Sequence, residues 1–93
     1  FGIMTWWLDP ATLRLERWAF LPTPAAFGEP YGFCMARFDG TTFLILNNKA
    51  GEVVAFAVSE GAGGRPAIAE RHRWKVASQP EGCVADDRTG DLY

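Results

Sequence analysis

Three side chains carry groups that could act on an anionic substrate. Tyr31 offers a hydroxyl, Lys49 an ammonium group and Glu81 a carboxylate. Calcium prefers hard oxygen ligands such as a carboxylate, and a lysine places a compact positive charge beside a phosphate oxygen. Each residue also has an ordinary structural interpretation: Glu81 as a solvated loop carboxylate, Lys49 as a solvated turn residue and Tyr31 as a packing aromatic. The residue types alone leave their roles open.

For three further candidate residues we favour structural roles. Asp86 and Asp87 could form a calcium-binding pair, but acidic residues that open a hairpin turn commonly accept backbone hydrogen bonds, and we assign them that role. His72 is the single histidine and lies between two arginines on an expected outer strand. We expect a solvated edge position for it, which argues against a histidine-dependent phosphatase mechanism.

The sequence contains two cysteines, Cys34 and Cys83. They do not make a zinc site, because such a site needs about four ligands at close spacing. We expect free buried thiols. A disulfide between neighbouring strands is the alternative, and it would require an oxidising compartment.

The composition excludes several classes of protein. The 93 residues suffice for one small domain, and 48% of them are hydrophobic, which is typical of a globular chain. A net charge of −2 argues against nucleic acid as a partner, since phosphate backbones require clustered Lys and Arg. The longest run without charge, residues 18–28, contains three prolines or glycines and is no membrane span. We therefore expect neither a nucleic-acid nor a membrane partner.

Short β-type runs separated by turn signals dominate the chain. No stretch holds the apolar stripe of a helix over three turns. Glycine, proline, asparagine and aspartate cluster between the runs, as in hairpin turns. The expected strands are residues 3–8, 13–20, 31–38, 42–46, 53–58, 67–76, 82–85 and 92–93.

A pattern recurs within this series of strands. The segments 30–34 and 80–84 both read Pro-X-Gly-apolar and lie 50 positions apart, with four expected strands between them. Four antiparallel strands in a repeat of roughly 40–50 residues are typical of a β-propeller blade. We therefore predict an all-β fold and a fragment of a β-propeller.

The repeat also assigns a place to each part of the chain. Residues 1–93 would belong to a single propeller domain, with 3–20 as the outer two strands of one blade, 31–76 as a complete blade and 81–93 as the start of the next. Tyr31 and Glu81 would then occupy equivalent positions where inner strands begin, facing one mouth of the central channel, a usual place for a ligand site. Because the sequence begins and stops in strand-like residues, we expect a fragment.

Four segments resemble the β-propeller phytase family. Glu29–Cys34 resembles that family's "E-x-Y-G-F", and Asn47–Gly51 resembles its turn "N-x-K-x-G". Ser78–Asp87 resembles the signature "S-Q-x-E-G-x-x-x-D-D", which Gly90–Tyr93 continues as "G-x-L-Y". The agreement runs from about residue 29 to the end, and the S-Q-P-E-G-C-V-A-D-D run is its specific part.

The resemblance implies a six-bladed propeller that uses calcium ions to hold phytate, myo-inositol hexakisphosphate, while activated water attacks phosphorus. It implies that Glu81 is an active-site calcium ligand, that Lys49 contacts a substrate phosphate, and that Tyr31 lies in the same catalytic cluster, near metal or phosphate. It further implies a secreted or periplasmic enzyme that is monomeric at full length. The fragment alone would be inactive, because the family's other site residues lie on other segments.

Two rival functions remain open at this point. The chain could belong to a non-catalytic propeller that binds a protein partner, or to another calcium-dependent propeller hydrolase such as a lactonase. Release of phosphate from phytate by the full-length protein, with and without a calcium chelator, distinguishes these possibilities.

Overall fold

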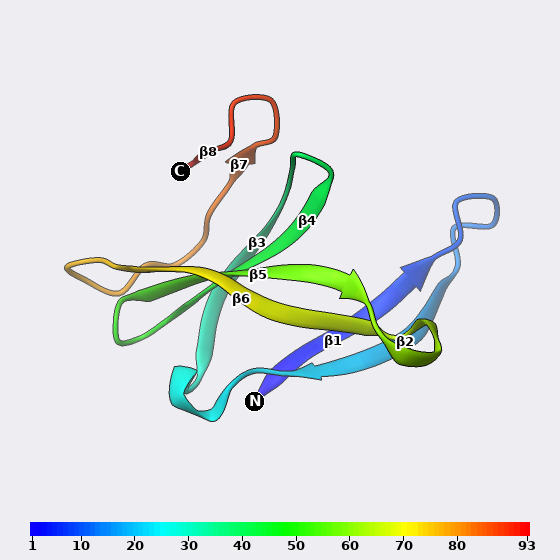
Figure 1. Ribbon diagram of the computed structural model, residues 1–93, viewed down its shortest axis with the longest axis horizontal. Coiled ribbons are helices and arrows are strands. Elements are labelled where there is room, and N and C mark those ends of the chain that lie inside the picture. The colour runs from blue at the N-terminus through cyan, green and yellow to red at the C-terminus, as the bar shows by residue number, and fades with distance from the viewer.

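The computed structural model describes all residues, 1–93, and shows three antiparallel sheets in chain order (Figure 1). A two-stranded hairpin comes first, a four-stranded sheet follows, and a short hairpin closes the chain. Two 3-10 turns, η1 (Ala25–Phe27) and η2 (Ala62–Gly64), are its only helical segments. The strands are β1 (Gly2–Leu8), β2 (Leu15–Pro22), β3 (Pro30–Phe38), β4 (Thr41–Asn48), β5 (Glu52–Glu60), β6 (Pro66–Lys75), β7 (Ala85–Asp86) and β8 (Asp91–Leu92).

The central sheet is a meander with the order β3-β4-β5-β6. Its two middle strands carry continuous apolar runs, which is typical of strands that are covered on both faces. The turn between β3 and β4 uses Asp39 and Gly40, both with positive φ, as a tight two-residue hairpin requires. In the β4–β5 ladder Leu44 pairs with Phe56, and Ile45 pairs with Ala55.

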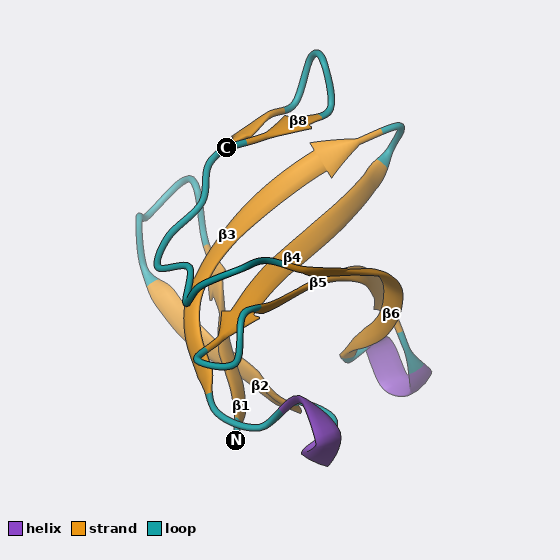
Figure 2. Ribbon diagram, turned by 90° about the vertical axis from the view of Figure 1, so that its left-hand side faces the viewer, coloured by secondary structure: helices purple, strands orange, loops and turns teal.

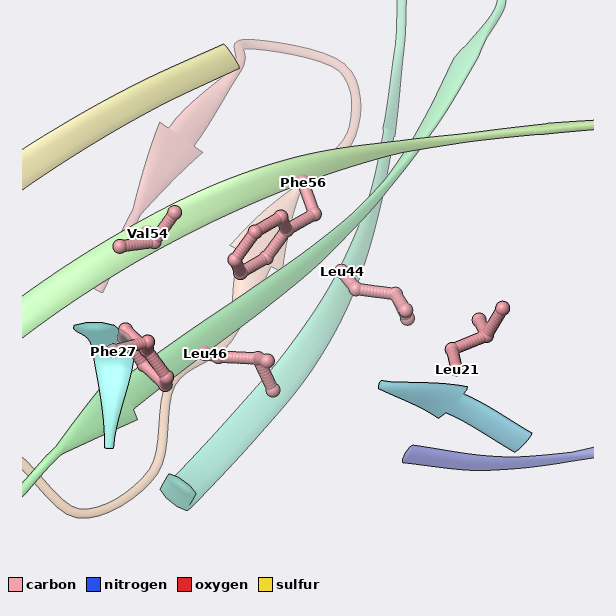
Figure 3. Close-up of a cluster of buried hydrophobic side chains, with 6 residues drawn as sticks. All are labelled: Leu21, Phe27, Leu44, Leu46, Val54 and Phe56. Carbon is pink, nitrogen blue, oxygen red and sulfur yellow. The ribbon is translucent and has the colours of Figure 1, made fainter. Parts of the chain in front are cut away.

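One face of this sheet packs against the first hairpin. The buried cluster takes residues from β2, η1, β4 and β5, and Figure 3 shows their side chains converging. Burying each such side chain contributes roughly 1.5–3 kcal/mol. The members are Leu21, Phe27, Leu44, Leu46, Val54 and Phe56.

The opposite face shares a cavity with the β7–β8 hairpin. Side chains in β4 and β5 alternate in direction, so Phe43, Ile45 and Ala55 point away from the core cluster. They line a cavity whose other lining residues include Ala85 and Leu92. The central sheet therefore lies between two hairpins, and Figure 2 shows the β7–β8 hairpin beyond the C-terminal end of β3.

The predicted fold class is confirmed. The chain is all-β, and its central four-stranded sheet with a hairpin against each face is consistent with a fragment of a β-propeller that includes one blade. The number of blades and the assignment of the two hairpins to neighbouring blades stay predictions. The structure contains no helix with the length and hydropathy that a membrane span requires.

One expected strand is shorter than the sequence indicates. We expected a strand over residues 82–85, but β7 begins at Ala85, and Glu81 lies in the preceding connection rather than at a strand start. The ladder of this hairpin reaches Val84, which exchanges two backbone hydrogen bonds with Tyr93, the last residue of the sequence. Gly82 and Cys83 have no strand opposite them and are not assigned to the sheet.

Candidate functional site

The candidate site lies at the end of the central sheet where β3 begins and β4 ends. β3 alternates large and small residues, and its large side chains are about half exposed. The small residues Gly32, Cys34 and Ala36 are more buried and form the other face of the strand. This face has room for a close approach by the C-terminal part of the chain.

The turn between β4 and β5 is held by a buried asparagine. The Oδ1 atom of Asn48 accepts hydrogen bonds from the backbone N–H groups of Ala50 and Glu52, both at 3.0 Å. Its Nδ2 atom donates to the backbone oxygen of Phe27 at 2.7 Å and to Oε2 of Glu52 at 2.8 Å. Because every polar atom of the Asn48 amide is used, the turn that carries Lys49 has a defined conformation.

Lys49 projects from this turn toward the beginning of β3. Its Nζ atom lies 5.8 Å from the centroid of the Tyr31 ring and 3.6 Å from Oε2 of Glu29. The Lys49 and Glu29 side chains are each 56% exposed, so their ion pair contributes little to stability. The structure thus brings two of the three predicted site residues together in an accessible position, and it adds Glu29.

The backbone of Glu81 lies against the same end of β3. Asn47, which is 2% exposed, donates from Nδ2 to the backbone oxygen of Glu81 at 2.8 Å. Its Oδ1 atom accepts a hydrogen bond from the backbone N–H of Gly32 at 3.1 Å. A Cβ atom at Gly32 would overlap the Glu81 carbonyl oxygen, so glycine is required there. Glu81 is therefore fixed beside the residue that follows Tyr31, while its exposed carboxylate forms no ion pair or hydrogen bond.

Cys34 and Cys83 form a disulfide, with their Cα atoms 5.4 Å apart. Our expectation of free buried thiols was wrong, and the alternative of a disulfide is what the structure shows. The physical reason is the approach of residues 81–83 to the small-residue face of β3, which brings two cysteines 49 positions apart in sequence within bonding geometry.

Asp86 and Asp87 have the structural roles that we expected. Asp86 accepts a hydrogen bond from the backbone N–H of Arg88 at 2.9 Å, and this bond, followed by those from the Arg88 side chain, lowers the pKa of Asp86. Asp87 accepts a hydrogen bond from the backbone N–H of Arg37 at 2.8 Å, which fastens the last hairpin to β3. His72 is exposed on β6, as expected, with its ring centroid 4.4 Å from that of Trp74.

The chain does not form a complete metal centre by itself. It contains no group of three or more histidine, cysteine, aspartate or glutamate residues that could hold an ion. Calcium takes 6–8 oxygen ligands, so one carboxylate supplies at most two of them. The free carboxylate of Glu81 fits the role of one contributing calcium ligand.

Two residues of this site were not identified from the sequence. In the sequence, Asn47 and Glu29 stand out only as members of the segments Asn47–Gly51 and Glu29–Cys34. The available signal for Asn47 was its position at the end of a continuous apolar strand, where a buried polar side chain must find partners. For Glu29 no signal beyond the motif was available.

Comparison with known proteins finds sequence similarity to a curated phytase. No family model matches the chain. A 74-residue alignment covering 77% of the chain is 31% identical to the 3-phytase of Bacillus subtilis (strain 168). The chain spans only 19% of the length of that phytase. The chain is therefore similar in sequence to about a fifth of a curated phytase.

Proposed function

We propose that the chain contributes a phosphate- and calcium-binding segment to a propeller hydrolase that cleaves phosphate monoesters of phytate. One observation carries the proposal: Tyr31 and Lys49 meet at one end of the central sheet, and the backbone of Glu81 is fixed there against Gly32, the residue that follows Tyr31. The similarity to a 3-phytase supports the choice of substrate.

Lys49 would bind a phosphate oxygen of the substrate. Its ammonium group has three donors and is half exposed, with a carboxylate of Glu29 as its present partner. A phosphate carries more charge than that carboxylate and would replace it as the partner of Lys49. Tyr31, with its ring beside Nζ, would orient the lysine and offer its hydroxyl to the same phosphate.

Glu81 would hold calcium together with oxygen ligands from other parts of the protein. Bound calcium would offset the charge of a polyanionic substrate and lower the pKa of a water molecule that attacks phosphorus. The chain contributes the fixed backbone position of Glu81 and the positive charge of Lys49, both at the end of the central sheet where β3 begins.

The disulfide supports a secreted or periplasmic location, since disulfides persist in oxidising compartments. We also propose that the full-length protein acts as a monomer on a small-molecule substrate.

The test is phosphate release from phytate by the full-length gene product. We expect release that is abolished by a calcium chelator and restored by added calcium. Phosphate release that is insensitive to the chelator would remove the calcium role, and absence of release would favour a partner-binding propeller or a lactonase. Hydrolysis of a lactone substrate distinguishes those two.

A variant tests the role of Lys49 in the same assay. Lys49→Met should raise KM for phytate on the order of tenfold, because it removes a charge-assisted contact with phosphate, and it should leave the melting temperature unchanged. Arg71→Gln removes an equal charge from β6, where the Arg71 side chain makes no ion pair or hydrogen bond, and serves as the matched control. Equal KM values for the two variants would mean that loss of any positive charge weakens phytate binding, and would contradict a specific contact by Lys49.

A further inference from the structure

The connection between β6 and β7 is held in place by very few contacts. Residues 77–83 make no backbone–backbone hydrogen bond. Their single hydrogen bond to the rest of the chain runs from the Asn47 side chain to the backbone oxygen of Glu81. Their covalent tie is the disulfide from Cys83 to Cys34.

The two ties act on matching positions. Gly32 and Cys34 lie two residues apart on β3 and so share a face of the strand. Glu81 and Cys83 are likewise two residues apart, and each is attached beside one of them: Glu81 through Asn47 to Gly32, and Cys83 through its sulfur to Cys34. A three-residue stretch is thus fixed at both ends against one strand.

The side chain of Glu81 has no partner of its own. It is exposed and forms no ion pair or hydrogen bond, so only its backbone is held. A ligand that must meet an ion at a defined place depends on such supporting contacts, because its own rotamers are otherwise free.

We propose that Asn47 and the Cys34–Cys83 disulfide are positioning residues for Glu81, and that they set the affinity with which Glu81 and its fellow ligands bind calcium. The inference rests on the proposed calcium role of Glu81. It assigns the disulfide a role in cation binding in addition to its effect on stability.

The experiment is a mutant cycle in the full-length gene product. The paired substitution Cys34→Ser/Cys83→Ser removes the covalent tie without leaving a free thiol. Asn47→Asp keeps the acceptor for the N–H of Gly32 but removes the donor to Glu81. Each change is made with Glu81 present and in a Glu81→Gln background, and calcium affinity is measured by calorimetry beside the calcium dependence of phosphate release.

With Glu81 present, each change should weaken calcium binding on the order of tenfold, as loss of a supporting contact to a metal ligand does. In the Glu81→Gln background the same changes should weaken it no further, because their effect acts through that carboxylate. Val54→Ala is the matched control: Val54 is fully buried in the core, so this change should lower the melting temperature and leave calcium affinity intact.

Three outcomes would overturn the inference. Removing either tie could leave calcium affinity unchanged, or it could lower calcium affinity as much in the Glu81→Gln background as with Glu81 present. In either case the proposed function would stand. If the unmodified protein neither binds calcium nor releases phosphate from phytate, the proposed function and this inference fail together. Should the paired serine variant not fold, reduction of the native disulfide and Asn47→Asp give the same comparison.

Discussion

At the scale of single residues, hydrogen-bonded polar side chains fix the β4–β5 turn and its surroundings. Asn48 and Glu52 illustrate this, because the hydrogen bond from Asn48 is the main cause that lowers the pKa of Glu52 below its ordinary value of 4.5. Arg73 adds an ion pair to Glu52 at 2.9 Å. The ionised form of Glu52 is therefore favoured in the folded state.

This shift predicts a loss of stability in acid. A carboxyl group whose pKa is lowered by folding contributes stability above its ordinary pKa, and that contribution disappears as pH falls through the lowered value. Melting temperatures measured between about pH 6 and about pH 3 should fall less steeply for Glu52→Gln than for the unmodified protein. Glu16→Gln, which alters an exposed side chain without ion pair or hydrogen bond, should keep the original slope. Parallel curves for all three proteins would contradict the prediction.

At the scale of elements, glycines at two hairpin turns meet different demands. Gly40 and Gly51 both have positive φ, at 74° and 83°. A Cβ atom at Gly40 would meet nothing within 4 Å, whereas one at Gly51 would lie 2.7 Å from the backbone oxygen of Val76. The β4–β5 turn is thus packed against the end of β6, where the backbone N–H of Val76 donates to the oxygen of Gly51 at 2.8 Å.

Alanine substitutions at Gly40 and Gly51 distinguish the cost of backbone strain from the cost of steric overlap. Gly40→Ala should destabilise the protein by about 1 kcal/mol through backbone strain alone. Gly51→Ala should cost at least about 1 kcal/mol more, because the added methyl group forces Val76 to move. Urea unfolding midpoints of the two variants provide the measurement, and equal midpoints would show that the turn adapts freely.

At the scale of the whole molecule, the three sheets are joined mainly through the central one. The first hairpin contributes to the buried cluster of the central sheet. The β7–β8 hairpin is instead attached by the disulfide and by the hydrogen bond from the backbone N–H of Arg37 to Asp87. Large aromatic side chains on the first hairpin remain about half exposed, among them Trp6 at 53% and Trp18 at 47%. In a closed propeller such surfaces would pack against adjoining blades.

The disulfide should therefore dominate the attachment of the last hairpin. It joins residues 49 positions apart, and a bridge of this kind stabilises a protein by about 2–4 kcal/mol. Addition of dithiothreitol should lower the urea midpoint of the protein accordingly. The Cys34→Ser/Cys83→Ser variant should show the lowered midpoint at once and no response to the reductant; a response of that variant would assign the effect to another cause.

The sequence by itself determined the all-β class, the turns and nearly all strand positions, because alternation and turn chemistry act between residues close in the chain. Its resemblance to the β-propeller phytases also implied that Tyr31, Lys49 and Glu81 share a site, and the structure brings Tyr31 and Lys49 together. The tertiary structure alone decided that the cysteines are bonded and that Asn47 joins the backbone of Glu81 to that of Gly32. Both depend on how closely residues 81–83 approach β3, which is set by packing between residues that are distant in the chain.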